Sequence, residues 1–335
     1  MGAVSSEELT HPFSSLSPEK VLSVVDGLNL KPDARIFALN SYENRVYQVG
    51  LTDGSSRIIK FYRPGRWSEA QILEEHKFCA ELIKLDIPVA APLNLGPDET
   101  LARVDEFYVA VFNKFSGRAP ELDDETNLSI MGRFVGRIHA VGAQSSFSER
   151  HEFTLERLGV KSREFLLSND FLPLELMRAY ESLSKDVICK VGKIFEENAP
   201  IDVLRIHGDC HFGNVLWNEG IPHFVDFDDS VTGPAIQDLW MMLSGSRNEQ
   251  QHQLSKIIKG YNEFYDFNLS ELPLIEGMRT LRLMNYSAWL ARRWDDPAFP
   301  RTFQWFNTES YWSRHILDLR EQFALLDEPS LEVRI

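Results

Sequence analysis

An eight-residue polar loop between two short apolar segments constrains this chain more than any other feature. The loop reads His207-Gly208-Asp209-Cys210-His211-Phe212-Gly213-Asn214. It follows the apolar segment 203–206, and Asp226 comes twelve residues after Asn214, at the end of His223-Phe224-Val225. These apolar residues predict two short strands that pair as a hairpin. Such a hairpin would bring Asp209, Asn214 and Asp226 to one end of a sheet.

Two carboxylates and a carboxamide at one end of a sheet are suited to phosphoryl transfer from Mg-ATP. One carboxylate accepts the proton of the attacking hydroxyl, and we assign this catalytic role to Asp209. A carboxamide and a second carboxylate hold the metal ions, so we assign Asn214 and Asp226 as Mg²⁺ ligands. Asp228 and Asp229 follow closely and are alternatives for an outer-sphere contact. The structural alternative for Asp209, an Asp that caps a loop, does not explain the spacing.

Composition indicates a globular protein with few partner classes. The chain has 335 residues, of which 43% are hydrophobic and 25% charged, enough for one large domain or two lobes. The net charge of -15 argues against broad binding to nucleic acid or to anionic membranes. Three widely spaced cysteines form neither a disulfide framework nor a zinc pattern. The sequence has no signal-peptide or membrane-spanning pattern, so we expect a cytoplasmic protein. It also has no coiled-coil stripe, so we expect a monomer.

The order of predicted elements favours an α+β, bilobal, protein-kinase-like fold. Residues 1–29 are expected to be an N-terminal extension with a helix from Ser17 to Leu28. Residues 30–112 alternate as short strands around one helix at 68–85, and form the predicted nucleotide-binding lobe. The polar linker 113–118 is the predicted hinge. Residues 119–335 are expected to form a helical lobe, with the active site in the cleft between the two lobes. Its predicted helices span 124–141, 151–168, 173–197, 234–244, 247–265, 271–294 and 308–326.

Lys60 is the candidate phosphate-binding lysine because it ends an apolar strand. In kinases such a lysine reaches the α- and β-phosphates and pairs with a glutamate on a helix. The partner should lie on the 68–85 helix, where Glu74 and Glu75 are adjacent and point about 100° apart. Glu75 lies on the apolar stripe of that helix, so we predict Glu75 and keep Glu74 as the alternative. An ordinary lysine at the end of a strand is the structural alternative for Lys60.

The segment joining the first two strands, 40–45, is the candidate phosphate-covering loop. It reads Asn40-Ser41-Tyr42-Glu43-Asn44-Arg45 and contains no glycine, so the Gly-rich loop of protein kinases is absent. Ser41 and Asn44 offer hydroxyl, amide and backbone donors, and Arg45 is a further candidate near the nucleotide. A polar hairpin turn without a ligand is the alternative.

Several other residues have structural readings. We expect His207 to fix the segment 207–214, the predicted catalytic loop, and Asp238 to accept backbone hydrogen bonds from this loop. An Asp that only stabilises the start of its own helix is an equal alternative for Asp238. Cys210 is expected to be a buried, inert thiol unless its pKa is lowered. Arg292 and Arg293 either are solvated residues of a Trp-rich helix or help to hold an acidic acceptor.

The catalytic segment resembles one family of kinases. The run from His207 to Asn214, followed by Asp226, matches the His-Gly-Asp-x-x-x-x-Asn loop and metal-binding Asp of the kinase-like phosphotransferases of the aminoglycoside phosphotransferase and choline kinase type. The resemblance covers about residues 30 to 295. It implies ATP as co-substrate and an ATP contact at Ser41. The chain departs from the Asp-Phe-Gly of typical protein kinases, which puts an activation-segment flip of their kind in doubt.

Further segments narrow the resemblance to a bacterial branch of this family that consists of Ser/Thr protein kinases. The segments are 40–48, 60–64, 288–294 and 296–300. The resemblance implies an enzyme that phosphorylates itself and Ser/Thr residues of protein substrates, and that protects bacteria from stress-induced cell death.

Two alternative activities follow from the residues. A small-molecule kinase for an aminoglycoside, choline or homoserine has the same fold, and Asp123, Asp124 and Glu125 would give it an acidic cleft unless they form a solvated face. A metallohydrolase would use His207-x-Asp209-x-His211 as a metal cluster, but it would leave Lys60 without a role. A catalytically inactive binding protein has no support, because every expected catalytic residue type is present.

Overall fold

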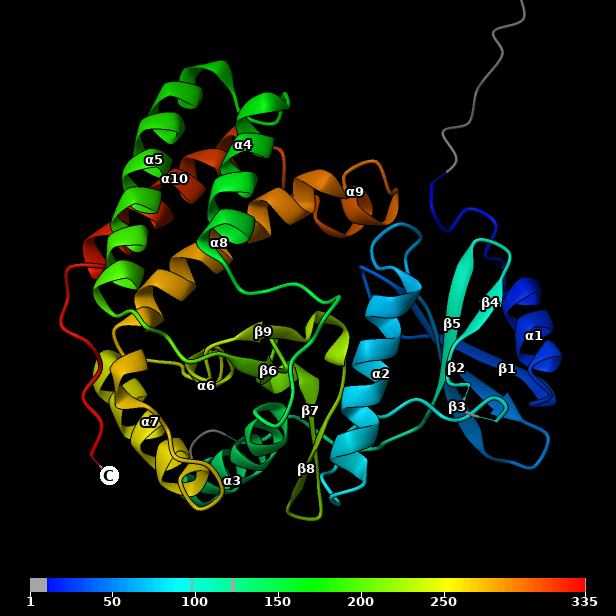
Figure 1. Ribbon diagram of the computed structural model, residues 1–335. Helices are drawn as coiled ribbons and strands as arrows, with labels where there is room; N and C mark the ends of the chain where they lie inside the picture. Colours follow the sequence, from blue (N-terminus) through cyan, green and yellow to red (C-terminus); the bar gives the residue numbers. More distant parts are fainter. Residues whose placement is uncertain (1–10, 98, 122–123, 335) are drawn as a thin grey trace, which may run out of the picture. The chain divides into compact units, whose positions relative to one another are not determined.

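The computed structural model describes residues 11–97, 99–121 and 124–334 (Figure 1). The chain forms two compact units. Unit 1 contains Met1–Glu69, Pro92–Lys114 and Arg293–Gln304, and unit 2 contains Ala70–Ala91, Phe115–Arg292 and Trp305–Ile335. The division after Lys114 falls within the predicted hinge, 113–118. Two segments depart from the continuous lobes that we expected: the helical stretch 70–91 belongs to unit 2, and 293–304 returns to unit 1.

Unit 1 is built on a five-stranded antiparallel sheet in the order β1-β2-β3-β5-β4. The strands are β1 Pro32–Ala38, β2 Arg45–Leu51, β3 Ser56–Phe61, β4 Ala102–Val104 and β5 Phe107–Asn113. Helix α1, Pro18–Gly27, begins as predicted, because the Ser17 side chain accepts the backbone N–H of Lys20 and Pro18 occupies the first turn. Val21 and Val25 of α1 belong to the buried core of the sheet, and Figure 1 shows α1 beside the sheet.

The β2–β3 hairpin positions Lys60 in the centre of this sheet. Its turn is the Asp53-Gly54 pair, in which Gly54 has a φ of 86° and the Asp53 side chain accepts the N–H of Ser55 at 2.8 Å. The resulting register sets Lys60 opposite Val46 on β2 and Ala110 on β5.

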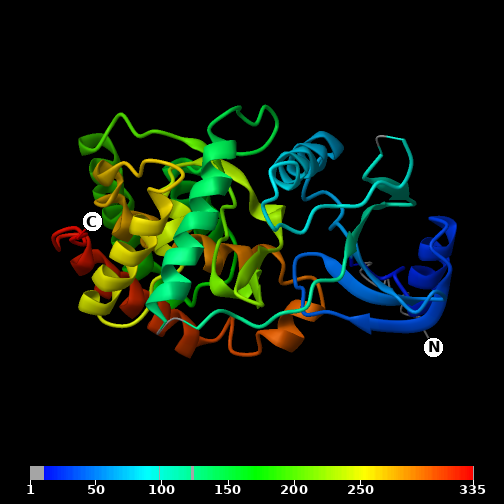
Figure 2. The same ribbon diagram turned by 90° about the horizontal axis from the view of Figure 1, so that it is seen from below.

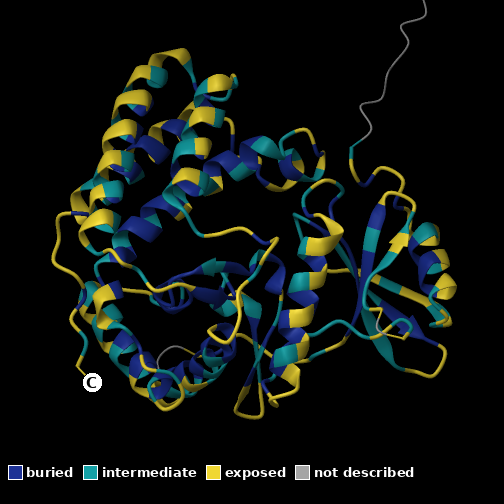
Figure 3. Ribbon diagram, viewed as in Figure 1, coloured by how far each residue is buried: buried dark blue, intermediate teal, exposed yellow. Residues whose placement is uncertain are grey.

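Unit 2 is mainly helical, as predicted. Its helices are α2 Glu69–Ile83 (which starts at the last residue of unit 1), α3 Glu125–Gly142, α4 Lys161–Ser168, α5 Leu174–Glu197, α6 Ile236–Trp240, α7 Arg247–Tyr261, α8 Leu274–Arg292 and α10 Glu309–Leu325. Figure 3 shows α6 and much of α8 as buried. Within the described residues, no helix combines the length and the apolar character that crossing a membrane requires.

Helices α3 and α7 pack side by side at very short distance (Figures 1 and 2). A Cβ at Gly132 would lie 2.0 Å from the carbonyl oxygen of Ile257, and a Cβ at Gly260 would lie 2.0 Å from that of Ser129. Only glycine permits backbones to approach so closely. This contact holds α3, which carries His139, against the core behind the catalytic loop.

The short strands of unit 2 do not form the hairpin that the sequence predicted. Strand β6, Leu204–Ile206, pairs with β9, Val231–Gly233, which we did not expect. The hairpin consists of β7, Val215–Asn218, and β8, Ile221–Phe224, closed by Glu219 and Gly220, both with positive φ. The local hairpin forms because its two turn residues allow a tight reversal, which leaves β6 to pair with a strand beyond Asp226. Helix α9, Ala298–Thr302 in unit 1, was also missed, because its prolines mask a helical pattern.

Candidate active site

The catalytic loop brings Asp209 and Asn214 together in unit 2. It leaves β6 at Ile206, passes through a short 3₁₀ turn, Phe212–Asn214, and enters β7 at Val215. The Nδ2 of Asn214 donates to the backbone oxygen of Asp209 at 2.9 Å and to its carboxylate Oδ2 at 3.2 Å. The predicted catalytic base and one predicted metal ligand are therefore neighbours.

A buried carboxylate on α6 holds the start of this loop. Asp238 accepts the backbone N–H groups of His207 and Gly208, each at 2.8 Å, which confirms the expectation for Asp238. Gly208 has a φ of 82°, and a Cβ there would lie 2.2 Å from the carbonyl oxygen of Asp229. The loop therefore needs both the carboxylate and the glycine.

Two residues behind Asp238 were not found from the sequence. His139 on α3 lies 3.0 Å from the Asp238 carboxylate through Nε2, and its Nδ1 lies 2.9 Å from the hydroxyl of Tyr261 on α7. All three side chains are buried. Neither residue lies near the motif in the sequence, and an isolated His in a helix gives no signal of such a contact. The chain of contacts links three helices to the catalytic loop.

The surroundings of Asp209 keep its carboxylate ionised. Burial by itself would raise the pKa of Asp209, but hydrogen bonding to His211 and the charge of Arg282 outweigh burial and lower the pKa to about 2. The Nη2 of Arg282 lies 2.8 Å from Oδ1, and Nε2 of His211 lies 3.4 Å from Oδ2. The Arg282 contact is an ion pair without hydrogen-bond alignment, since Oδ1 has no hydrogen-bond partner among the described residues. At neutral pH Asp209 is thus a charged hydrogen-bond acceptor.

Asp226 follows β8 in a left-handed backbone conformation, with φ 61° and ψ 61°. Two contacts hold Val225, the residue before Asp226. The N–H of Val225 donates to the carbonyl oxygen of Asn214, and the carbonyl oxygen of Val225 contacts Nε2 of His207, both at 2.9 Å. Left-handed non-glycine residues cost of order 1 kcal/mol and concentrate at functional sites. His207 fixes this part of the site, as expected.

Asn214 and Asp226 have the chemistry of a Mg²⁺ site. Because Nδ2 of Asn214 donates to Asp209, the side-chain oxygen of the amide is the atom left for a metal. An amide oxygen and a carboxylate are hard ligands of the kind that Mg²⁺ binds while keeping several waters. The residues present therefore fit this ion.

The histidines of the loop do not form the alternative metal cluster. His207 contacts Val225 and the Asp209 N–H, whereas Nδ1 of His211 accepts the N–H of Gly213 at 2.9 Å. Across the described ranges, no three His, Cys, Asp or Glu side chains converge as metal ligands would. Burial raises the pKa of the Cys210 thiol well above its usual value, which agrees with an inert cysteine.

The alternative glutamate of α2, Glu74, has a different role. Its carboxylate accepts the backbone N–H groups of Ser148, Glu149 and Arg150 at 2.6, 2.9 and 2.9 Å. This engagement within unit 2 favours Glu75, which is 2% exposed, as the partner of Lys60. The pairing itself stays a prediction.

Arg150 ties α2 to the turn that follows Asp226. Its guanidinium donates to the carbonyl oxygens of Gln71 at 2.9 Å, Ser230 at 2.6 Å and Asp228, and it lies 3.7 Å from the carboxylate of Glu75. The side chain is completely buried. The sequence gives no signal for Arg150, because its partners include backbone carbonyls 79 and 80 positions away along the chain.

The predicted nucleotide residues of unit 1 have specific local contacts. Lys60 is 5% exposed, and its ammonium lies 4.8 Å from the ring centroid of Tyr62. Ser41 donates through Oγ to the carbonyl oxygen of Asn44 at 3.1 Å. Asn44 is 4% exposed, and its Oδ1 accepts the N–H of Arg63 at 3.0 Å, so the amide stabilises the loop itself. ATP contacts by these residues remain predictions.

An ionic network, consisting of Glu43, Arg45, Arg63, Arg293 and Asp296, holds the 40–45 loop. Arg63 lies 2.6 Å and Arg45 lies 3.2 Å from Asp296, while Arg293 lies 2.8 Å from Glu43. Arg63 also donates to the carbonyl oxygen of Glu43 at 2.8 Å. Arg293 and Arg45 thus have structural partners. The pairing of Arg63 with Asp296 could not be predicted, because the two residues are 233 positions apart.

Arg292 is engaged within unit 2. Its guanidinium donates to the carbonyl oxygen of Lys161 at 3.2 Å and lies 5.0 Å from the ring centroid of Phe165. Together with the pairing of Arg293, this contact favours a structural role for the two arginines over a role in holding the acceptor, although they contact protein groups and are not the solvated residues of the structural alternative.

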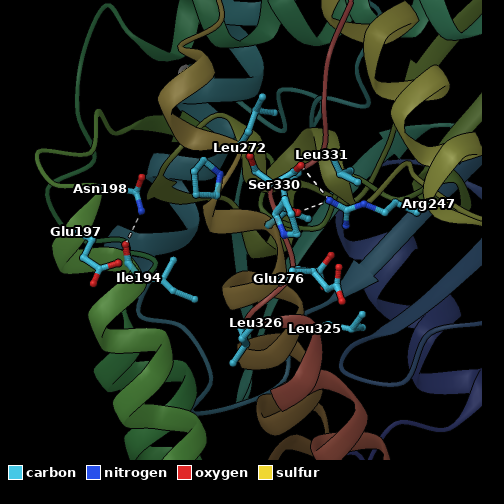
Figure 4. Close-up of a pocket in the computed structure, with 14 residues that line it drawn as sticks. Ile194, Glu197, Asn198, Arg247, Leu272, Glu276, Leu325, Leu326, Ser330 and Leu331 are labelled. Carbon is cyan, nitrogen blue, oxygen red and sulfur yellow. Dashed lines mark hydrogen bonds between the residues drawn. The ribbon is translucent and has the colours of Figure 1, made fainter.

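A cavity of about 130 Å³ lies elsewhere in unit 2, under the C-terminal segment (Figure 4). Arg247 donates to the carbonyl oxygens of Pro329 and Ser330 beside it, and Glu276 also lines it. None of the predicted site residues lines this cavity, so it has no part in the chemistry assigned above.

Comparison with known proteins identifies the family. Residues 35–275 match the model described as the phosphotransferase enzyme family. The chain is 41% identical over 321 residues to stress response kinase A of Escherichia coli (strain K12), covering 96% of this chain and 97% of the relative. It is 40% identical over 321 residues to the serine/threonine protein kinase RdoA of Salmonella typhimurium, with the same coverage.

Solved structures confirm the predicted α+β kinase-like fold. Amicoumacin kinase hAmiN, in complex with AMP-PNP and Ca²⁺, matches with a TM-score of 0.69 and 19% identity, over 90% of this chain and 93% of that one. A microcompartment-associated aminopropanol kinase matches with a TM-score of 0.66 and 17% identity, over 92% and 96%. Choline kinase LicA from Streptococcus pneumoniae gives 0.62 and 13%, over 91% and 98%. The chain is thus a kinase of the phosphotransferase enzyme family and groups with the stress response kinase A proteins.

Proposed function

We propose that this protein is a Mg-ATP-dependent Ser/Thr protein kinase that phosphorylates itself and protein substrates in the cytoplasm during the bacterial stress response. The observation that carries the proposal is the contact of Asp209 with Asn214 on a loop anchored by Asp238. A relative named as a serine/threonine protein kinase supports a protein acceptor, and relatives named as stress response kinases support the role in stress.

Each proposed site residue has one part in the reaction. Asp209 orients the acceptor hydroxyl and takes its proton. Asn214 and Asp226 would hold Mg²⁺, which when bound neutralises the phosphate charge. Lys60, supported by Glu75, contacts the α- and β-phosphates. Ser41 and Asn44 contribute to the loop that covers them.

Transfer of radiolabelled phosphate from ATP tests the proposal. Wild type, Asp209→Asn and the exposed-site control Asp186→Asn would be incubated with Mg²⁺, alone and with a generic protein acceptor, before phosphoamino-acid analysis. We expect label on Ser or Thr with the wild type and the control, and a loss of at least 10²-fold in Asp209→Asn. Thermal unfolding of each variant checks that the fold is kept.

A different outcome would reassign the acceptor. If no protein is labelled but ATP is consumed when aminoglycosides or amino alcohols are added, the enzyme is a small-molecule kinase. Label that persists in Asp209→Asn would contradict the assignment of the base.

A further inference from the structure

The catalytic carboxylate lies beside an arginine that no motif predicted. Arg282, on α8, lies 2.8 Å from Asp209 through Nη2, and its side chain is 46% exposed. Nε2 of His211 lies 3.4 Å from Oδ2, the other oxygen of the Asp209 carboxylate, and the His211 side chain is 41% exposed. Two nitrogen-bearing side chains that face solvent therefore flank the group that must receive the acceptor hydroxyl.

Arg282 retains hydrogen-bonding capacity after its contact with Asp209. Among the residues that the structure describes, its guanidinium has one further hydrogen-bond contact, from Nη1 to the sulfur of Met241 at 3.9 Å, which is a weak acceptor. A guanidinium carries five N–H donors in a planar fork that suits a carboxylate. Because nearly half of the side chain is exposed, its remaining donors are available to a ligand that approaches Asp209.

The acidic residues proposed for a cationic acceptor are engaged elsewhere. Glu125 pairs with Lys256 at 2.6 Å and with His252 at 2.8 Å. Asp124 accepts the N–H of Thr126 and caps α3, while Asp123 lies outside the described residues. These contacts favour the solvated-face reading of this acidic run over an acidic cleft.

The surface of α8 next to Arg282 is aromatic. Tyr286 lies one turn further along and is 40% exposed, and its ring centroid is 5.7 Å from that of Trp289. Residues at these spacings share one side of a helix. A cation followed by aromatic rings offers an extended chain both a charge contact and an apolar surface.

We propose that Arg282 selects the acceptor by binding an Asp or Glu side chain that lies next to the Ser or Thr to be phosphorylated. The substrate class is thus protein segments with acidic residues beside the acceptor hydroxyl. A cationic group at the same place would meet the like charge of Arg282. This inference rests on the proposed function, because it assumes a protein acceptor.

The charge preference can be measured with three short peptides that contain one serine flanked by Glu, Gln or Lys. We expect the wild type to have a higher kcat/KM for the Glu peptide than for the Lys peptide, by on the order of tenfold. Arg282→Glu should invert this ratio, and Arg282→Lys should keep its direction with a smaller size. Arg314→Glu, an exposed charge reversal on α10, should leave the ratio unchanged.

The ratio separates selectivity from catalysis. A general loss of rate through misplacement of Asp209 lowers kcat/KM for every peptide and cancels in the ratio. Should Arg282→Glu fail to fold, Arg282→Gln gives the same test, with an expected ratio near one. Equal kcat/KM values in the wild type, or a ratio that Arg282 variants do not change, would overturn the inference. Absence of phosphate on any peptide or protein with wild type would contradict the proposed function instead.

Discussion

The two loops assigned to the reaction are held in opposite ways. The 40–45 loop of unit 1 depends on ion pairs among charged side chains, centred on Asp296 and Arg63. The catalytic loop of unit 2 depends on one buried carboxylate, Asp238, which accepts backbone N–H groups. The 40–45 loop is thus held mainly through ion pairs of side chains, with added contacts to its carbonyl oxygens, and the catalytic loop is held through its backbone N–H groups.

This difference determines which side chains remain for a substrate. In the 40–45 loop, Glu43, Asn44 and Arg45 are used to hold the loop, and the Ser41 hydroxyl donates to the Asn44 carbonyl oxygen. Contacts of this loop with phosphate should therefore come mainly from backbone N–H groups. In the catalytic loop the anchor uses the backbone of His207 and Gly208 and leaves the Asp209 carboxylate for the catalytic role that we propose for it. A loop without glycine thus reaches a fixed conformation at the expense of its own polar side chains.

Replacing Asp238 with Ala should have the largest effect. Two buried N–H groups and His139 would lose their acceptor, and disruption of a buried charged network costs about 3–5 kcal/mol. We expect a loss of this size in the free energy of unfolding, together with loss of kinase activity. Urea unfolding measures it, with Asp186→Ala on the surface of α5 as the control. A loss below about 1 kcal/mol would mean that the catalytic loop does not depend on this anchor.

Replacing Asp296 with Asn should have a smaller and more selective effect. Arg63, which is 4% exposed, would lose a charged partner, so we expect about 2 kcal/mol of destabilisation. If the 40–45 loop covers the phosphates, KM for ATP should rise while kcat at saturating ATP changes little. Asp295→Asn, the exposed neighbour, is the matched control. Equal KM values for the two variants would show that the network does not support nucleotide binding.

The sequence predicted the parts of the site that are local. Asp209 and Asn214 lie five positions apart, so their contact follows from a single turn, and the long helices follow from their apolar periodicity. The anchors were not predictable, because His139 and Asp238 are 99 positions apart and Arg63 and Asp296 are 233 apart. Pairing over such distances depends on tertiary packing that one sequence does not show. The β6–β9 pairing was not predicted for the same reason, because strands of three residues carry too little sequence pattern to specify a partner.

Two carboxylates that support the two loops, Asp296 and Glu271, should also respond to pH in opposite directions. Burial opposes ionisation of Asp296, but its hydrogen bond with Arg63 outweighs burial and lowers its pKa. Its contribution to stability is therefore lost as pH falls through this lowered pKa. In unit 2, Glu271 accepts the Ile236 N–H at 2.8 Å, at the start of the helix that carries Asp238. Burial raises the pKa of Glu271 from its usual 4.5 to about 7. The contribution of protonated Glu271 to the free energy of unfolding is therefore fully present below about pH 4.5 and is lost as pH rises through about 7.

Glu271→Gln should separate these two responses with the smallest change. The amide keeps an acceptor for Ile236 and has no charge to desolvate. As the pH rises from 5 to 8, the free energy of unfolding of the variant should therefore increase by roughly 2 kcal/mol relative to that of the wild type. Urea unfolding at the two pH values measures the difference, with Glu175→Gln at an exposed position of α5 as the control. Parallel pH dependence in wild type and variant would show that the pKa of Glu271 is not raised in the folded protein, so that the side chain is already ionised at pH 5. The start of α6, and the Asp238 anchor with it, would then be held by a buried charge, as the 40–45 loop is held by Asp296.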